Sequence, residues 1–189
     1  MKSSIGLFYQ LTVRDKNGKV VRKTRLRRSR SFCIAFLQML QVQMLGVDKD
    51  IRDNLNSLET GTPASTNFFG AGPAGNDDWG IILGTGTTPP TNTDYVIETK
   101  IEHGSGATQI NYAIQTDIDA QEVGANVDYQ LIRSFQNLSG STINVSEAGF
   151  YGYVASPAKY GLMVHDTFTT VPVLDGETLT ATYIFRTTV

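Results

Sequence analysis

The sequence predicts a mainly β protein, an antiparallel, jelly-roll-like β-sandwich preceded by a β-hairpin and one amphipathic helix. Charged residues make up only 18% of the 189 residues, below the usual quarter, and the remaining polarity comes from Thr, Ser, Asn, Gln and 18 glycines. This bias favours strands and turns over helical surfaces. Strand-like runs separated by turn clusters and the strict alternation near residue 180 point the same way.

The hairpin is predicted at the start of the chain. Residues 5–13 and 18–26 each alternate imperfectly between apolar and polar side chains, and Asn17-Gly18 lies between them. An Asn-Gly pair between two strand-like runs is a strong hairpin signal, because both turn residues adopt positive φ.

Helical spacing follows over residues 31–46, with Ser31 as a candidate N-cap and Gly46 as a stop. One stripe of this helix carries Phe32, Phe36, Leu40 and Met44. We expect the stripe to pack on the protein's own sheet, and the alternative is a partner-binding helix. Residues 1–58 are therefore predicted to form a hairpin-helix arm.

Charge is distributed unevenly along the chain. Residues 1–30 hold ten basic residues and one acidic residue, whereas the other 159 residues carry a net charge of −11. A basic segment beside an acidic body indicates docking on an acidic protein surface, contact with nucleic acid, or a solvated hairpin without a partner. We favour docking and regard nucleic acid as an unlikely partner. The candidate assembly contacts are Arg22, Lys23, Arg25, Arg27, Arg28 and Arg30.

Residues 59–78 are rich in Gly, Pro and Thr and show no periodicity, which predicts an extended connection. Connections of this length usually cross a surface or serve as linkers. Phe68 and Phe69 in its centre are expected to be buried against protein, and we count both among the candidate assembly contacts, because burial of an aromatic ring contributes about 1.5–3 kcal/mol.

Residues 79–189 are predicted to form the sandwich itself. The most regular strand covers residues 177–189, where Leu179, Ala181, Tyr183 and Phe185 share one face. The other expected strands cover residues 79–83, 108–115, 127–136, 142–154 and 162–168.

Two charged residues interrupt apolar faces of the expected strands. Arg133 lies on the apolar face of residues 127–136, and Glu147 lies on that of residues 142–154. If residues 138–142 close a hairpin, Arg133 stands opposite Glu147, and the two would form a structural ion pair. The alternative is a bulge near Ala148-Gly149 that turns Glu147 outward.

Motifs of catalysis and cofactor binding are not found. The sequence holds no nucleophile elbow, no HExxH zinc motif and no phosphate-binding loop, and His103 is expected in a loop. Asp77-Asp78 and Asp117/Asp119 do not fit calcium-loop spacing and are interpreted as turn residues. One cysteine and two histidines argue against a structural zinc site, and the apolar run 32–45 is too short to span a membrane. We expect no enzyme activity, cofactor, metal or membrane contact.

Several stretches resemble a family of small virion structural proteins of tailed bacteriophages and related prokaryotic viruses. They are residues 28–37, 80–95, 135–140 with 145–151, and 171–173 with 176–183. The resemblance implies a homo-oligomer assembled in the host cytoplasm that contacts copies of itself and other virion proteins. It leaves capsid decoration, neck, tail and fibre attachment open.

The sequence therefore predicts a non-enzymatic virion structural protein. The alternative is a carbohydrate-binding or adhesion module, because sandwiches with exposed aromatic side chains can bind sugars. The aromatic candidates are Trp79, Tyr95, Tyr151 and Tyr153.

Overall fold

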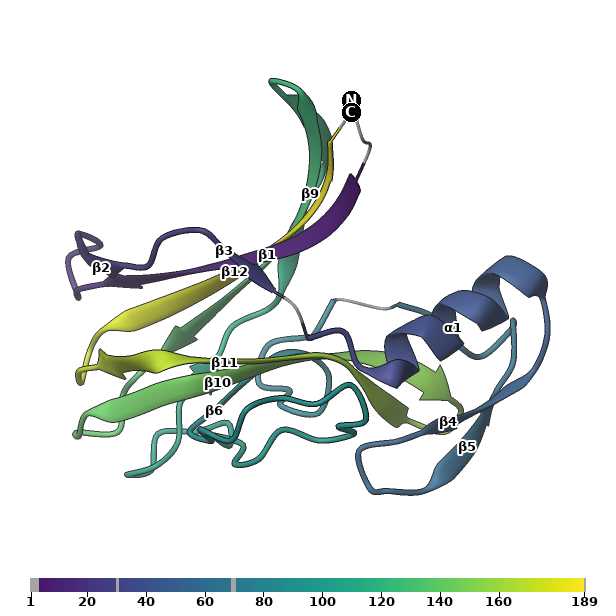
Figure 1. The fold of residues 1–189 in the computed structure, drawn as a ribbon. Helices are drawn as coiled ribbons and strands as arrows, with labels where there is room; N and C mark the ends of the chain where they lie inside the picture. The colour runs from purple at the N-terminus through teal and green to yellow at the C-terminus, as the bar shows by residue number, and fades with distance from the viewer. Residues whose placement is uncertain (1–3, 30, 69–70, 189) are drawn as a thin grey trace.

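A computed structural model describes residues 4–29, 31–68 and 71–188, and within this part of the chain two antiparallel sheets pack face to face beside one helix (Figure 1). The predicted β-sandwich with an N-terminal hairpin and one helix is confirmed. The elements are β1 (Ser4–Arg14), β2 (Val20–Lys23), β3 (Arg27–Ser29), α1 (Ile34–Leu45), β4 (Lys49–Arg52), β5 (Leu58–Gly61), β6 (Gly80–Gly84), β7 (Asn111–Tyr112), β8 (Thr116–Val123), β9 (Asn126–Gln136), β10 (Ile143–Ala155), β11 (Lys159–Val173) and β12 (Thr178–Thr188).

The large sheet has the strand order β2-β1-β12-β9-β7, with β3 added beside β1 and β8 beside β9. Its β1 strand pairs with β12 along its whole length, from Ser4 opposite Thr188 to Arg14 opposite Thr178. Alternate β1 side chains, including Leu7 and Val13, are buried in the core. The expected boundary of the sandwich at residue 79 is therefore wrong, because residues 4–14 supply one of its central strands.

The predicted hairpin forms between β1 and β2, with Thr12 opposite Lys23. Its turn is closed by a hydrogen bond from the Asp15 amide to the Lys19 carbonyl, and Gly18 adopts a φ of 80°. That conformation favours glycine. Asn17 does not share it, so the expectation that both turn residues adopt positive φ is wrong for Asn17.

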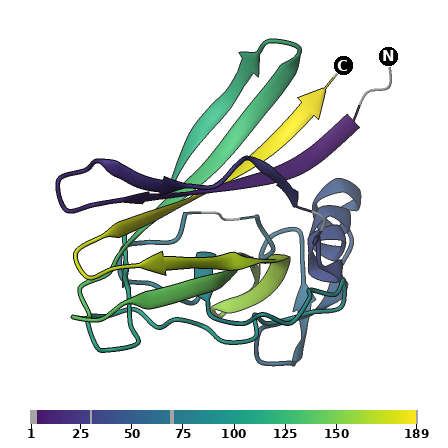
Figure 2. The same ribbon diagram turned by 60° about the vertical axis from the view of Figure 1, so that its left-hand side comes forward.

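The small sheet has the strand order β11-β10-β6 and covers the inner face of the large one. Every residue of β6 is buried, and β10 is buried at eleven of its thirteen positions. Figures 1 and 2 show that the two sheets lie close together at one end and diverge at the other, where α1 and the β4–β5 hairpin lie.

The helix ends where predicted, because Gly46 is left-handed (φ 64°) and donates a hydrogen bond to the Val42 carbonyl. It begins only at Ile34, because Phe32 is extended and forms a bridge with Val164 of β11. Its buried residues are Ala35, Met39 and Val42. The predicted core stripe is therefore wrong at its end, since Met44 is 73% exposed.

Candidate functional site

One edge of the large sheet is basic. Among residues 4–29, 31–68 and 71–188, β2 and β3 pair only with β1, so their outer backbone groups face away from the sheet. Residues 19–29 contain six basic residues and no acidic one. The exposed members of the predicted contact set are Lys23, Arg25, Arg27 and Arg28. Arg22 is instead in an ion pair with Glu177 of the same chain, and Arg30 lies outside the described residues.

The opposite edge of the same sheet is acidic. In the part of the chain that the structure describes, β8 pairs with β9 alone. Its exposed side chains include Asp117, Asp119 and Glu122, and the strand contains no basic residue. The interpretation of Asp117 and Asp119 as turn residues is wrong. The sequence did not reveal this strand because its two faces are both largely exposed, so it has no apolar alternation.

Phe68 packs inside its own chain. Its ring lies 5.6 Å from that of Phe36 in α1, and both help to line an apolar pocket of about 360 Å³ where the two sheets diverge. Phe68 is therefore covered by residues of its own chain, and its side chain is only half-buried. Phe69 lies outside the described residues.

Arg133 and Glu147 do not pair, although both side chains are fully buried. The expected hairpin is absent because β9 pairs with β12 and β8, whereas β10 pairs with β11 and β6 in the other sheet. The chain crosses between sheets after Gln136. The ladder between β10 and β11 is irregular between Val145 and Glu147, so a bulge lies close to the position that the alternative gave it. Glu147 lies on the same face as His165, whereas Asp166 lies on the opposite face and contacts Tyr183 of the large sheet. Glu147 is thus turned away from the large sheet, and loop 85–99 buries it.

All the hydrogen bonds observed for the Arg133 side chain go to backbone carbonyls. Its guanidinium donates to five of them at 2.5–3.1 Å, and its Cζ lies 4.8 Å from the centre of the Tyr112 ring. The acceptors belong to Pro73, Asn76, Trp79, Ile81 and Ala113. Burial lowers the pKa of Arg133 to about 10, so the side chain stays charged near neutrality. Through these hydrogen bonds Arg133 holds residues 71–79 of the connection against the large sheet.

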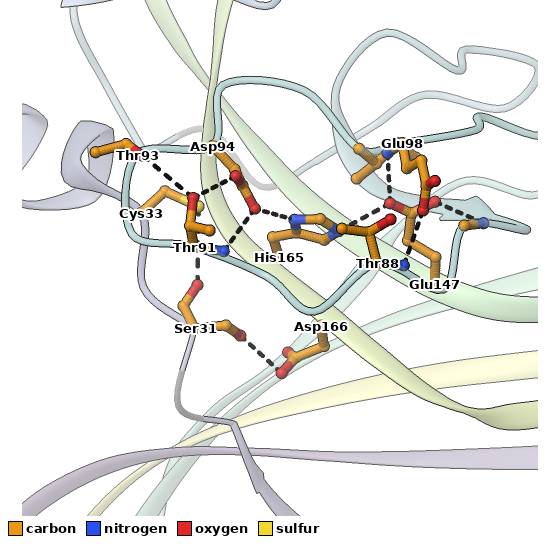
Figure 3. Close-up of polar contacts among 12 residues, drawn as sticks. Ser31, Cys33, Thr88, Thr91, Thr93, Asp94, Glu98, Glu147, His165 and Asp166 are labelled. Carbon is orange, nitrogen blue, oxygen red and sulfur yellow. Dashed lines mark hydrogen bonds and ion pairs between the residues drawn. The ribbon is translucent and has the colours of Figure 1, made fainter.

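Glu147 is the centre of a second buried cluster (Figure 3). One of its oxygens lies 2.8 Å from Nε2 of His165, and the Nδ1 of that ring lies 2.6 Å from Asp94. The Glu147 carboxylate also accepts hydrogen bonds from the backbone amides of Gly86, Glu98 and Thr99. The loop 85–99 therefore wraps around one carboxylate and one imidazole of the small sheet.

The electrostatics of this cluster favour an imidazolium between two carboxylates. Burial acts to lower the pKa of His165, but the hydrogen bonds and charges of Glu147 and Asp94 outweigh it, so the pKa is raised. Burial acts to raise the pKa values of Glu147 and Asp94, and their hydrogen bonds lower them below the ordinary carboxyl range. The three groups stabilise one another in their charged forms.

The geometry suits a structural cluster better than acid-base chemistry. Both nitrogens of His165 are already engaged by carboxylates, so neither is available to a substrate without breaking a contact. The nearby thiol of Cys33 is buried, and burial raises its pKa to about 12, which keeps it protonated and poorly nucleophilic. The Ser31 hydroxyl donates a hydrogen bond to the Asp166 carboxylate at 2.7 Å (Figure 3).

The aromatic candidates separate into different places. Tyr151 is buried, and its hydroxyl accepts a hydrogen bond from the Ile97 amide. Tyr95 lies below the cation of Arg52, at 5.9 Å from its Cζ. Trp79 and Tyr153 come together with Tyr160, which sequence reasoning missed, around a pocket that Asn67 also lines.

No protein-family model, curated protein or solved structure matches this chain. Within residues 4–29, 31–68 and 71–188, no three His, Cys, Asp or Glu side chains are grouped so as to hold a metal ion. Helix α1, with twelve residues, is too short to cross a membrane, and the described part of the chain holds no other candidate span.

Proposed function

We propose that the protein is a non-enzymatic structural component of a virus particle that joins copies of itself through the two edges of its large sheet. The observation that carries this proposal is the opposite charge of those edges. Lys23, Arg25, Arg27 and Arg28 are exposed on the β2–β3 side, and Asp117, Asp119 and Glu122 are exposed on the β8 side.

Both edges carry backbone groups that have no ladder partner among the described residues, so each can accept another strand. Charged side chains on one edge alone would serve to prevent aggregation, because like edges repel. Opposite charges on the two edges change this outcome, since a basic edge attracts the acidic edge of the next copy. Such head-to-tail contacts form rings when they close and filaments when they do not.

The virion setting comes from the resemblance of residues 28–183 to small phage structural proteins, and the repeated contact described above suits a particle built from many copies. Helix α1 adds an apolar surface for other virion proteins. Ile34, Leu37, Met44 and Leu45 of this helix are 48–73% exposed. Apolar side chains gathered on one exposed face are typical of interaction sites.

Sedimentation velocity at low and high salt tests self-association. Wild-type protein should form oligomers at low salt that dissociate as salt rises, because exposed charges are screened. The variant R25E/R27E/R28E has two acidic edges and should be monomeric. The variant D117K/D119K/E122K has two basic edges and should be monomeric as well, whereas an equimolar mixture of the two variants should assemble again.

Asp48→Lys is the matched control, since this exposed residue lies between α1 and β4, away from both edges. It should assemble as the wild type does. Monomeric wild-type protein at low salt, or a mixture of variants that stays monomeric, would overturn the edge contact. Mass spectrometry and cryo-electron microscopy of purified virus particles test the virion setting, which fails if the protein is absent from them.

A further inference from the structure

We infer that a pocket lined by hydroxyl groups at the start of β10 binds one residue of an uncharged saccharide. The pocket has a volume of about 310 Å³ and also borders residues 85–87, β11 and the turn at residues 107–108. Six of the residues that line it carry a hydroxyl group: Thr85, Thr87, Thr108, Thr142, Ser146 and Thr170. This inference does not depend on the proposed assembly of copies.

Ser146 is the residue that points most directly to a ligand. It is only 3% exposed, and among the described residues its hydroxyl has no hydrogen-bond partner. Buried hydroxyl groups are nearly always hydrogen-bonded, so one that faces a pocket indicates a partner from outside the chain. Water can fill this role in the free protein, and a sugar hydroxyl reproduces the hydrogen bonds of the water that it displaces.

An irregularity in the ladder between β10 and β11 places Ser146 at the pocket. The register shifts between Val145 and Glu147, so Ser146 stands opposite the three residues 168–170 of β11. Bulges re-aim side chains and are over-represented next to active sites. Thr170 belongs to the longer side of the same irregularity and also lines the pocket. The bulge therefore supplies two of the hydroxyl groups.

The other walls of the pocket are held by hydrogen bonds of their backbone amides. The amides of residues 85–87 donate to one carbonyl and two carboxylates at 2.8–3.0 Å. Thr108 lies in a turn that is closed by a hydrogen bond from the Gln109 amide to the Gly106 carbonyl at 2.9 Å. Threonine is β-branched and has few side-chain rotamers, so its hydroxyl loses little conformational freedom when it binds a ligand. The site is therefore organised before a ligand arrives.

The lining side chains determine the chemistry of the ligand. A hydroxyl group both donates and accepts, and so does the amide of Asn144, whose side chain has no partner in the described part of the chain. None of the described residues that line the pocket is charged, so a charged ligand would lose hydration without gaining a counter-charge. An apolar ligand would leave the hydroxyl groups unpaired. A neutral ligand with several hydroxyl groups meets both conditions.

A saccharide fits this pocket better than a peptide does. An extended peptide is recognised mainly through main-chain groups along one strand edge, whereas the hydroxyl groups here are side chains of separate segments of the chain. The methyl groups of threonine and the side chain of Ile143 can also contact the C–H groups of a sugar ring. The volume lies at the lower end of the range of roughly 300–1,000 Å³ for ligand pockets, which suits one sugar residue.

A glycan array tests the inference with the full chain. It should carry glycans that end in glucose, galactose, mannose or N-acetylhexosamine, together with sialylated and sulfated glycans as charged counterparts. High salt in the binding buffer screens the proposed edge contacts, so binding to the pocket is measured apart from assembly. We expect binding of a subset of the neutral glycans, with an affinity that salt does not change.

Variants that lack single hydroxyl groups then locate the site in an NMR titration with the best-bound neutral glycan. Ser146→Ala should weaken binding about tenfold, because a sugar hydroxyl is left without its partner in a buried position. Thr142→Val and Thr170→Val keep the shape of the side chain and should each weaken binding about three- to tenfold. Because the Ser146 hydroxyl has no partner among the described residues, Ser146→Ala should keep the urea midpoint of the wild type.

Thr169→Val is the matched control, because Thr169 is exposed, neighbours Thr170 in β11 and does not line the pocket. It should bind as the wild type does. The inference would be overturned by an array without bound neutral glycans, by a preference for charged glycans, or by unchanged binding in Ser146→Ala. It would also fail if Thr169→Val and Thr170→Val lost binding equally, or if Ser146→Ala lowered the urea midpoint.

Discussion

Arg133 on the large sheet and Glu147 on the small sheet are both completely buried, and their charges are neutralised in different ways. Arg133 on the large sheet is surrounded by five carbonyl groups, so neutral dipoles stabilise its charge. Glu147 on the small sheet has an imidazolium beside it and three backbone amides around it. The difference shows that a buried charge needs complete hydrogen bonding, which a loop can provide as well as a counter-ion can.

Loss of Arg133 should have the largest effect on stability. Arg133→Met removes the donor for five carbonyls and should lower the free energy of unfolding by about 4 kcal/mol. Arg133→Lys should recover only a small part, because an ammonium cannot reproduce the planar arrangement of donors. Urea denaturation measures both. Arg27→Met, on the exposed β3 edge, should change stability by about 0.5 kcal/mol or less.

Glu147→Gln should cost about 3 kcal/mol, because His165 loses one of its two carboxylates in a buried site. If the Glu147 charge stabilises the protein through its contact with His165, a double-mutant cycle of Glu147→Gln and His165→Asn should show strong coupling between the two positions. Additive effects would mean that the backbone amides alone stabilise Glu147. The same cycle between Glu147→Gln and Arg133→Met should show weak coupling, since the two residues share no hydrogen-bond partner.

Each buried charge has a glycine against it, and both glycines should resist substitution. A Cβ at Gly84 would lie 2.2 Å from a Glu147 oxygen, and one at Gly72 would lie 2.8 Å from an Arg133 nitrogen. Gly84→Ala and Gly72→Ala should each cost about 1–3 kcal/mol in thermal or urea unfolding. Gly6→Ala is the control, because its nearest neighbour is the edge of the half-buried Phe8 ring, which can move. An equal cost at Gly6 would contradict the explanation.

The smallest expected effect is the dependence of stability on pH that comes from the cluster of His165, Glu147 and Asp94. In the folded protein the pKa of His165 is raised above its unfolded value of 6.5, so the stability that His165 contributes is fully present below pH 6.5. It is lost as pH rises through the folded pKa. Asp94 and Glu147, whose pKa values are lowered, act at the acidic end, where stability is lost as pH falls through their folded values.

Unfolding free energies measured from neutral to alkaline pH should therefore decline in the wild type and decline less in His165→Asn. Arg133→Met should keep the wild-type slope near neutrality, because its partners are carbonyls that do not titrate. An identical slope in the wild type and in His165→Asn would show that other groups set the pH dependence.

Sequence reasoning located the strands better than it located their partners. Alternation predicts β9, β10 and β12 and the burial of Arg133 and Glu147, because burial of alternate residues is a local property. It places Glu147 on the wrong face of its strand, since the irregularity between Val145 and Glu147 turns this side chain toward His165 and loop 85–99. Partner choice depends on the connection 137–142, which carries the chain to the other sheet instead of closing a hairpin. Asn137 is buried there and donates to the carbonyls of Ser141 and Val173, a tertiary arrangement without a periodic signal.

The helix and the acidic edge show two further limits. Residues 32–45 are apolar on more than one side, so the pattern alone does not decide which side of the helix is buried. Contacts with β4 and β11 select the side with Ala35, Met39 and Val42. Strand β8 lacks an apolar face altogether. The cluster of His165, Asp94 and Glu147 was not predicted either, because its members are distant in sequence and only Glu147 interrupted an apolar pattern.

The pairing of β1 with β12 also bears on how the chain folds during synthesis. The small sheet is complete once β11 has left the ribosome, whereas β1 must wait for β12, which follows all the other described strands in the chain. Until then only β2 and β3 cover one side of β1. Contacts between such distant segments form slowly, since a long loop must close first. The nascent protein thus keeps its large sheet open at the centre, and the two charged edges gain their final positions together, after β12 joins β1 to β9.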